Sequence, residues 1–220
     1  MIRSVTLIRF RAGTDEASRE AVRQAYLGLP AHIPELLSIS PGLDLGLLPE
    51  TGDLAVVAEF ATAADFLAYS QHPAQVELIL PVCGPVLESW LTLQHEFIDA
   101  AYMRAYYEAY NSEDPERLRG FYHPEVELHS SQGVLRGPEA ILDTYRFITS
   151  NFSDRMSPES IMLAGATAVV DIRDCFVAKV EVPDFLGMAL DAGQSFELRL
   201  RGTYTLRDGA LFRIVIDHEG

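Results

Sequence analysis

The sequence predicts an α+β protein built from two domains, residues 1–97 and residues 98–220. In the first domain strand and helix patterns alternate, whereas in the second the helix patterns come early and strands dominate afterwards. Apolar residues make up 48% of the 220 residues and charged residues 22%, which is the composition of a chain that folds around a core. No linker rich in glycine, serine or proline separates the halves, so we expect the second domain to start almost directly after the first.

The first domain has the element order strand, helix, strand, strand, helix, strand. Its strand patterns lie at residues 2–10, 36–47, 53–60 and 89–97. Thr14 is a good N-cap for the first helix, which Gly28 and Pro30 end. Thr62, with Asp65 three residues later, forms the capping box of a second helix. This order is that of the ferredoxin-like fold, which closes one small core.

The second domain opens with a helical stripe over residues 98–111. A short helix is predicted to begin at Asp114–Pro115 and a third at Gly137–Pro138, because both pairs are typical of helix starts. Strand patterns lie at residues 126–130, 160–163, 167–179, 194–206 and 211–217. Turns are expected at Ala164–Gly165 and Asp208–Gly209. These elements predict a strongly bent antiparallel sheet combined with helices.

Charge and motif content exclude several classes of function. Seventeen basic and 32 acidic residues give a net charge of −15, which repels nucleic acids and anionic membrane surfaces. No stretch reaches the ~20 apolar residues of a membrane span, and the N-terminus reads as a strand rather than a secretory signal. Cys83 and Cys175 lack metal-ligand spacing, and no glycine-rich nucleotide motif is present. We expect a cytoplasmic protein with no metal, cofactor, nucleic-acid or membrane partner.

Residues 1–97 resemble the stress-responsive A/B barrel family, often called Dabb. The residues that carry the resemblance are Met1–Phe10, Asp53–Phe60 and Ala68–Val76. The resemblance implies a ferredoxin-like domain that forms a homodimer, with the two sheets packed face to face. It also implies an apolar cavity in each subunit.

Cyclase-like members of the Dabb family handle a substrate proton with a Tyr and a His. Tyr69 matches the Tyr, but Gln75 stands in the place of the His, and an amide does not exchange protons near neutral pH. His72 is close by in the sequence, so Tyr69 and His72 form a candidate second site. Core packing of Tyr69, and capping by His72 of the helix that restarts at Pro73, are the alternative interpretations.

Residues 98–220 resemble the SnoaL-like polyketide cyclase group of the nuclear transport factor 2-like fold. The resemblance rests on Tyr107–Pro115, Glu125–His129, Leu135–Ala140, Phe185–Met188 and Leu206–Gly209. It implies a cone-shaped α+β barrel, in which a curved sheet surrounds an apolar pocket that helices close. Proteins of this shape include cyclases, isomerases, dehydratases, hydrolases and binders, so the fold alone does not decide the chemistry.

Asp174 is an acidic residue on the otherwise apolar face of the strand predicted at 167–179. That face also carries Val170, Ile172, Phe176 and Ala178. A buried carboxyl group must find hydrogen bonds or raise its pKa, and a raised pKa suits a general acid or base. A structural Asp with satisfied hydrogen bonds is the alternative.

His129 matches the pocket His of the SnoaL-like pattern and can pass a proton without a cofactor. With Asp174 it would form a catalytic pair. By strand alternation, however, His129 shares a face with Glu127, which indicates an exposed His unless a bulge intervenes. The acid that the family carries on its last strand falls here on Ile216. Asp217 misses that place by one residue and is expected to point outward.

The inner faces of these strands are predicted to be apolar and aromatic. The candidate ligand-binding residues are Tyr106, Tyr110, Tyr145, Phe176 and Tyr204. The outer faces of strands 167–179 and 194–206 alternate in charge, which predicts a ladder of ion pairs.

The leading hypothesis is a cofactor-independent acid/base enzyme of the cyclase, isomerase or dehydratase type. It would bind a small apolar carbonyl compound, such as a polyketide, with a Tyr of helix 98–111 polarising the carbonyl group. The alternative is a non-catalytic binder or carrier of hydrophobic ligands, with residues 1–97 as its dimerisation domain.

Overall fold

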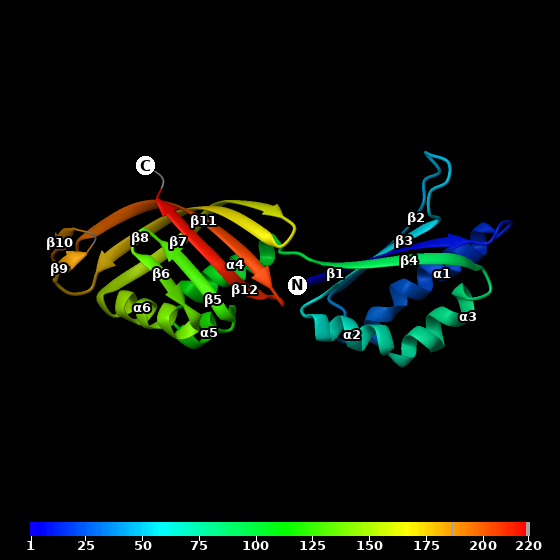
Figure 1. Cartoon of the computed structure of the whole chain (residues 1–220), viewed down its shortest axis with the longest axis horizontal. Helices are drawn as coiled ribbons and strands as arrows, with labels where there is room; N and C mark the ends of the chain where they lie inside the picture. The colour runs from blue at the N-terminus through cyan, green and yellow to red at the C-terminus, as the bar shows by residue number, and fades with distance from the viewer. Residues whose placement is uncertain (186, 219–220) are drawn as a thin grey trace. The chain divides into compact units, whose positions relative to one another are not determined.

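The computed structural model describes residues 1–185 and 187–218, and the chain divides into two compact units, Met1–Glu96 and Phe97–Gly220 (Figure 1). Leu186, which belongs to the Phe185–Met188 motif, lies outside the described residues. Within the described part of the chain no helix is long and apolar enough to cross a membrane.

The N-terminal unit is a four-stranded antiparallel sheet with helices on one face (Figure 1). In sheet order its strands are β2 (Ser38–Leu43), β3 (Leu54–Phe60), β1 (Ile2–Phe10) and β4 (Leu87–Glu96). Its helices are α1 (Glu16–Gly28), α2 (Ala63–Gln71) and α3 (Leu80–Cys83), with a 3-10 turn at Leu29–Ala31 and a π-helical turn at Gln75–Ile79. The ferredoxin-like order predicted from the sequence is confirmed.

The helix caps of this unit follow the sequence in one case and correct it in another. Thr62 and Asp65 form the predicted capping box, with each side chain accepting the other residue's backbone N–H. The first helix is capped by Asp15 and not by Thr14, because the Asp15 carboxylate accepts the N–H of Ser18 at 2.7 Å. A carboxylate at this position also interacts favourably with the helix dipole.

The strand predicted over residues 36–47 shortens to the six residues of β2. From Asp44 the chain leaves the sheet, and the Asp44 carboxylate accepts hydrogen bonds from the backbone N–H of Gly46 and the hydroxyl of Thr51. These contacts order a local turn instead of further strand pairing. Pro41 lies within β2, at the edge of the sheet, where its missing N–H is tolerated.

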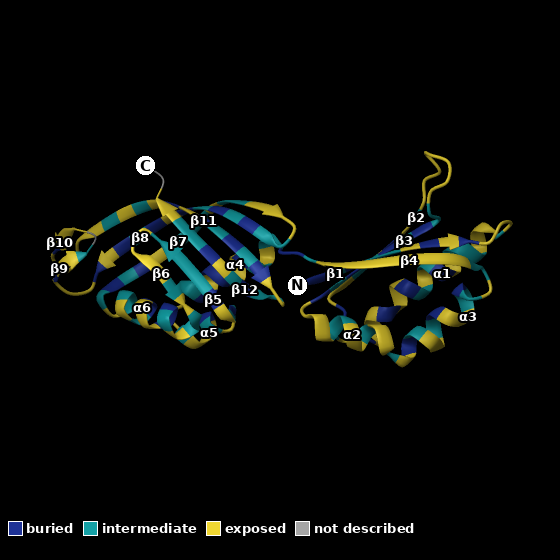
Figure 2. Cartoon of the chain, viewed as in Figure 1, coloured by how far each residue is buried: buried dark blue, intermediate teal, exposed yellow. Residues whose placement is uncertain are grey.

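The helices bury one face of this sheet and leave the other uncovered. Ile8 and Phe60, on the helix side, are at most 2% exposed. Leu7, Leu91 and Leu93, on the opposite side, are 46%, 68% and 52% exposed, and β4 is exposed along most of its length (Figure 2). We call these three leucines the open leucine face.

The C-terminal unit wraps a six-stranded sheet around three helices (Figure 1). The helices are α4 (Ala100–Tyr110), α5 (Pro115–Arg119) and α6 (Gly137–Asn151). In sheet order the strands are β6 (Gly133–Arg136), β5 (Tyr122–Ser130), β12 (Ala210–His218), β11 (Ser195–Arg207), β8 (Thr167–Ala178) and β7 (Phe152–Ala164). A separate hairpin pairs β9 (Val182–Phe185) with β10 (Met188–Leu190). The predicted α+β class is confirmed.

The helix starts and the tight turn of this unit match the sequence patterns. Asp114 caps α5 by accepting the backbone N–H of Glu116, directly before Pro115. Asp208 and Gly209 both have positive φ, of 52° and 79°, as the predicted two-residue hairpin turn requires. The sequence did not predict β6, β9 or β10, which are short, and it placed the start of β7 eight residues too late.

Charged residues cover the outer faces of β8 and β11, as predicted, and Glu159 of β7 joins them. Arg199 pairs with Glu159 at 3.1 Å, and Arg201 pairs with Asp171 at 2.7 Å. Exposed pairs of this kind contribute little to stability but keep the outer face solvated. The strand register shifts in β7 next to Pro158, at the free edge of the sheet.

Candidate functional site

A cavity of about 810 Å³ lies in the C-terminal unit, lined by residues of α4, α5, α6 and the inner face of the sheet. Most lining side chains are aliphatic or aromatic. Hydrogen-bonding groups are contributed by the tyrosines and by Ser130, Gln132, Thr144 and Asp184. A cavity of this size and composition suits a small, largely apolar ligand that carries a few polar atoms.

Two aspartates are buried on the inner face of the sheet next to this cavity. Asp174 on β8 and Asp154 on β7 are each 1% exposed, and we call them the acid pair. In the sheet register Asp174 lies opposite Met156, which lines the cavity. Tyr110, a second lining residue, donates its hydroxyl to Asp154 Oδ2 at 2.7 Å. One hydrogen bond therefore connects the acid pair to the cavity wall.

The environment of the acid pair favours protonation. Burial raises the pKa of Asp174 to about 9, and the neighbouring Asp154 adds to the shift. Burial also raises the pKa of Asp154, against hydrogen bonds from Asp174 and Tyr110. With both groups ionised, the Oδ1 atom of each would have no donor among the described residues. A proton held between the two carboxyl groups supplies a donor inside the pair. One carboxyl group is then an acid and the other a base.

The structure does not bring His129 to Asp174. His129 Nε2 lies 2.9 Å from a carboxylate oxygen of Glu127, on the outer face of β5. The neighbours of His129 in the strand, Leu128 and Ser130, line the cavity instead. The β5–β12 register is regular from Glu127 to His129, so strand alternation decides the orientation. The expected catalytic pair of His129 and Asp174 is therefore not formed.

The other predicted residues divide between the cavity and the core. Ile216 lines the cavity and Asp217 is exposed, as alternation requires. Phe176 does not line the cavity, because its ring stacks on Phe196, with centroids 4.8 Å apart, in a small aromatic core. The remaining candidates all line it: Tyr106, Tyr110, Tyr145 and Tyr204.

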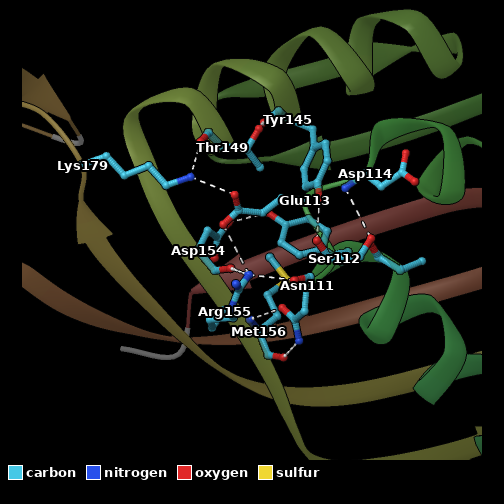
Figure 3. Close-up of polar contacts among 12 residues, drawn as sticks. Asn111, Ser112, Glu113, Asp114, Tyr145, Thr149, Asp154, Arg155, Met156 and Lys179 are labelled. Atoms are coloured by element: carbon cyan, nitrogen blue, oxygen red, sulfur yellow. Dashed lines mark hydrogen bonds and ion pairs between the residues drawn. The ribbon is translucent and has the colours of Figure 1, made fainter.

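A polar network holds the end of α4 against β7 (Figure 3). Asn111 exchanges two hydrogen bonds with the backbone of Met156, at 2.8 and 2.9 Å. Arg155 donates to the Asn111 carbonyl at 2.7 Å and lies 3.5 Å from the Glu113 carboxylate. Because Tyr110 directly precedes Asn111, the network fixes where its hydroxyl meets the acid pair.

A second cavity, of about 390 Å³, lies in the N-terminal unit and is lined by Tyr69. Burial raises the pKa of this phenol. Gln75 also lines the cavity, and its amide donates to the Tyr69 carbonyl at 3.4 Å. His72 is not a lining residue, and its Nδ1 accepts the N–H of Ala74 at 3.2 Å, the capping role given as the alternative. The candidate second site thus has only one of its two residues at the cavity.

Cation-binding groups are sparse in the described ranges 1–185 and 187–218. No cluster of three or more His, Cys, Asp and Glu side chains there has a geometry that could hold a metal ion. The acid pair supplies two carboxyl groups, fewer ligands than calcium or magnesium takes. Cys83 and Cys175 are both free thiols.

Comparison with protein-family models bears on both units. The model of the SnoaL-like domain matches residues 103–214, just over half of the chain. The chain belongs to the SnoaL-like family. The model of the stress responsive A/B barrel domain matches residues 2–97, so a Dabb domain precedes the SnoaL-like domain. Both resemblances predicted from the sequence are confirmed. No curated protein matches the chain.

Solved structures resemble either the Dabb domain or the SnoaL-like domain. A dimeric ferredoxin-like protein of unknown function from Thermobifida fusca is 35% identical, over 42% of this chain and 87% of its own, with a TM-score of 0.39. IdmH, a putative polyketide cyclase from Streptomyces antibioticus, is 21% identical over 55% and 91%, with a TM-score of 0.47. An LEH-like epoxide hydrolase of M. tuberculosis is 12% identical over 54% and 80%, with a TM-score of 0.45.

Sequence reasoning missed Asp154, the second acid of the SnoaL-like domain. It lies just after α6, where no strand was predicted. A signal was present, because Phe152, Asp154 and Met156 recur at every second position. Extending the predicted strand 160–163 backwards would still have placed Asp154 on the outer face, because the register shift between Pro158 and Ser160 reverses the alternation.

Proposed function

We propose that the SnoaL-like domain is a cofactor-independent acid/base enzyme that moves a proton on a small apolar carbonyl compound. Cyclisation, isomerisation and dehydration are the reactions of this type. The observation that carries the proposal is the acid pair: two buried carboxyl groups next to an apolar cavity, connected to it by the hydroxyl of Tyr110. Burying two carboxyl groups costs stability, so their presence in the core favours a role in proton transfer.

In this mechanism Tyr110 meets the substrate and the acid pair stores the proton. The phenol oxygen of Tyr110 accepts a proton from the carbon next to the substrate carbonyl while its own proton passes to Asp154. Burial and the two nearby carboxyl groups keep the pKa of Tyr110 well above its ordinary value, so the phenol relays protons without remaining ionised. Asp174, protonated at neutral pH, stabilises the carboxylate form of Asp154 by donating to it.

The test uses 2-tetralone, a small apolar ketone with exchangeable protons next to its carbonyl. Exchange of these protons in D₂O is followed by NMR with the full chain. Asp154→Asn removes the acceptor and is expected to lower the exchange rate about 10²- to 10⁴-fold, the usual contribution of a general base. The matched control is Asp217→Asn, an exposed aspartate in the same domain. An Asp154→Asn protein that binds the ketone and exchanges at the wild-type rate would contradict the proposal.

A non-catalytic carrier is the second candidate function, and one observation favours it. Both carboxyl groups are 1% exposed and neither lines the cavity, so a ligand reaches them only through Tyr110. A carrier would bind 2-tetralone saturably without any exchange above the rate in buffer. The same NMR measurement therefore separates the two functions.

The Dabb domain is proposed to join two copies of the chain through the open leucine face. The support is apolar surface that no element of its own unit covers, since Leu91 and Leu93 are more than half exposed. Burying such surface contributes about 25 cal/mol per Å². Sedimentation of the full chain should give the mass of a homodimer, and a monomer at micromolar concentration would contradict this assembly.

A further inference from the structure

The hydroxyl groups of Tyr107 and Tyr204 are 2.8 Å apart, and either can be the donor. Each phenol carries one hydrogen, so the pair has two hydrogens and the contact between them uses one. In the described part of the chain, this contact is the sole side-chain hydrogen bond of either hydroxyl. One hydrogen of the pair is therefore left without an acceptor. Both side chains are almost completely buried, at 2% and 1% exposure, so an acceptor for that hydrogen must come from inside the domain rather than from bulk solvent.

The position of the cavity indicates which of the two phenols carries the hydrogen that has no acceptor. Tyr204 lines the cavity and Tyr107 does not. If Tyr107 donates to Tyr204, the Tyr204 hydroxyl can turn its hydrogen toward a ligand, and the first bond strengthens the second. Two other phenols that line the cavity already donate a hydrogen bond. Tyr110 donates to Asp154, and Tyr145 donates to the carbonyl of Tyr110.

We propose that Tyr204, supported by Tyr107, donates the hydrogen bond to the carbonyl oxygen of the ligand. This assigns the carbonyl-polarising role to a residue of β11 rather than to a tyrosine of α4. The inference rests on the proposed function only for the ligand class, an apolar compound with a carbonyl acceptor. Burial and the neighbouring phenols raise the pKa of Tyr204, so it acts as a neutral donor.

Gly202 is the residue that allows this arrangement. Tyr204 folds back along its own strand, and a Cβ atom built at Gly202 would lie 2.4 Å from Cε2 of Tyr204 and 2.6 Å from its hydroxyl oxygen. Real Cβ atoms essentially never approach so closely, so any other residue at 202 must displace the ring. Gly202 therefore acts as a positioning residue for the phenol, although it has no side chain of its own.

The experiment uses Prodan, a small apolar fluorescent ketone whose emission moves to longer wavelength when its carbonyl group accepts a hydrogen bond. Its binding to the full chain is followed by the emission maximum of the bound probe. Tyr204→Phe is expected to move that maximum to shorter wavelength and to weaken binding about 5-fold, the effect of one net hydrogen bond. Gly202→Ala should move it in the same direction while keeping the hydroxyl. Tyr107→Phe should give a smaller shift.

Tyr102→Phe is the matched control, because it removes a phenol of the same domain that does not line the cavity. Its bound probe should emit at the wild-type wavelength. Unchanged emission in Tyr204→Phe, or an equal shift in Tyr102→Phe, would overturn the assignment of the donor. These outcomes leave the acid pair untouched, since proton exchange from 2-tetralone tests that pair separately. Failure of the wild-type chain to bind Prodan would overturn the inference by removing the carbonyl-ligand site itself.

Discussion

The protonated acid pair should make the SnoaL-like domain less stable as the pH rises. In the folded chain the pKa of Asp174 is raised to about 9, whereas an unfolded aspartate titrates near ~4. Between these values the folded state binds more protons than the unfolded state, so the free energy of unfolding falls with increasing pH. One full proton corresponds to about 1.4 kcal/mol per pH unit, so pH 5.5 to 8.5 spans at most about 4 kcal/mol.

Asp174→Asn isolates this contribution. The amide has nearly the shape of the protonated acid and can donate to Asp154, but it does not titrate. We expect the variant to lose most of the pH dependence and to be more stable than the wild type at pH 8.5. Asp171→Asn is the control, because Asp171 is on the same strand but pairs with Arg201 on the outer face. It should keep the wild-type slope.

The assay is urea unfolding at several pH values, with one signal for each unit. Seven of the nine tyrosines lie in residues 97–220, so near-ultraviolet circular dichroism follows the SnoaL-like domain. Trp90, the single tryptophan, reports the Dabb domain by fluorescence and serves as an internal reference. The reasoning is refuted if the difference between the urea midpoints of the wild type and Asp174→Asn, followed by tyrosine circular dichroism, is the same at pH 5.5 and at pH 8.5.

Three further outcomes are expected. Gly202→Ala should lower the free energy of unfolding by about 1–3 kcal/mol, measured with urea, because Tyr204 must leave its position; an unchanged midpoint would show that the ring adapts without cost. Thr62→Ala removes the capping box with Asp65 and should cost about 1 kcal/mol in the Trp90 transition; no change would mean that the cap is redundant. Leu93→Glu places a charge on the open leucine face and should convert the proposed dimer to a monomer in sedimentation, and a persistent dimer would place the interface elsewhere.

Much of the fold could be predicted because local signals were strong. The capping box at Thr62 and the Asp114–Pro115 start rely on contacts within three residues, so the sequence alone specifies them. Only residues 160–163 of β7 were predicted, because Pro158 and the register shift beside it break the alternation. Elements of three or four residues, such as β10, form through pairing with a partner strand and leave little pattern of their own.

The candidate site was predicted less completely, for a different reason. Alternation along one strand placed Asp174 on the inner face and Ile216 at the cavity. The same rule argued that His129 points outward, and the structure follows the rule rather than the family pattern. The approach of Asp154 to Asp174 depends on the register of two strands, which a single sequence does not specify.

The edges of the two large sheets differ in how readily they accept another strand. Pro41 interrupts β2, Pro158 and its register shift interrupt β7, and β6 spans four residues. The fourth edge, β4, is ten residues long and contains no proline. A filament that grows by strand addition needs two edge strands that can pair in every subunit. With a single such edge strand, the assembly is closed after one partner has been added. The prolines of β2 and β7 and the shortness of β6 would thus protect this chain from open-ended polymerisation.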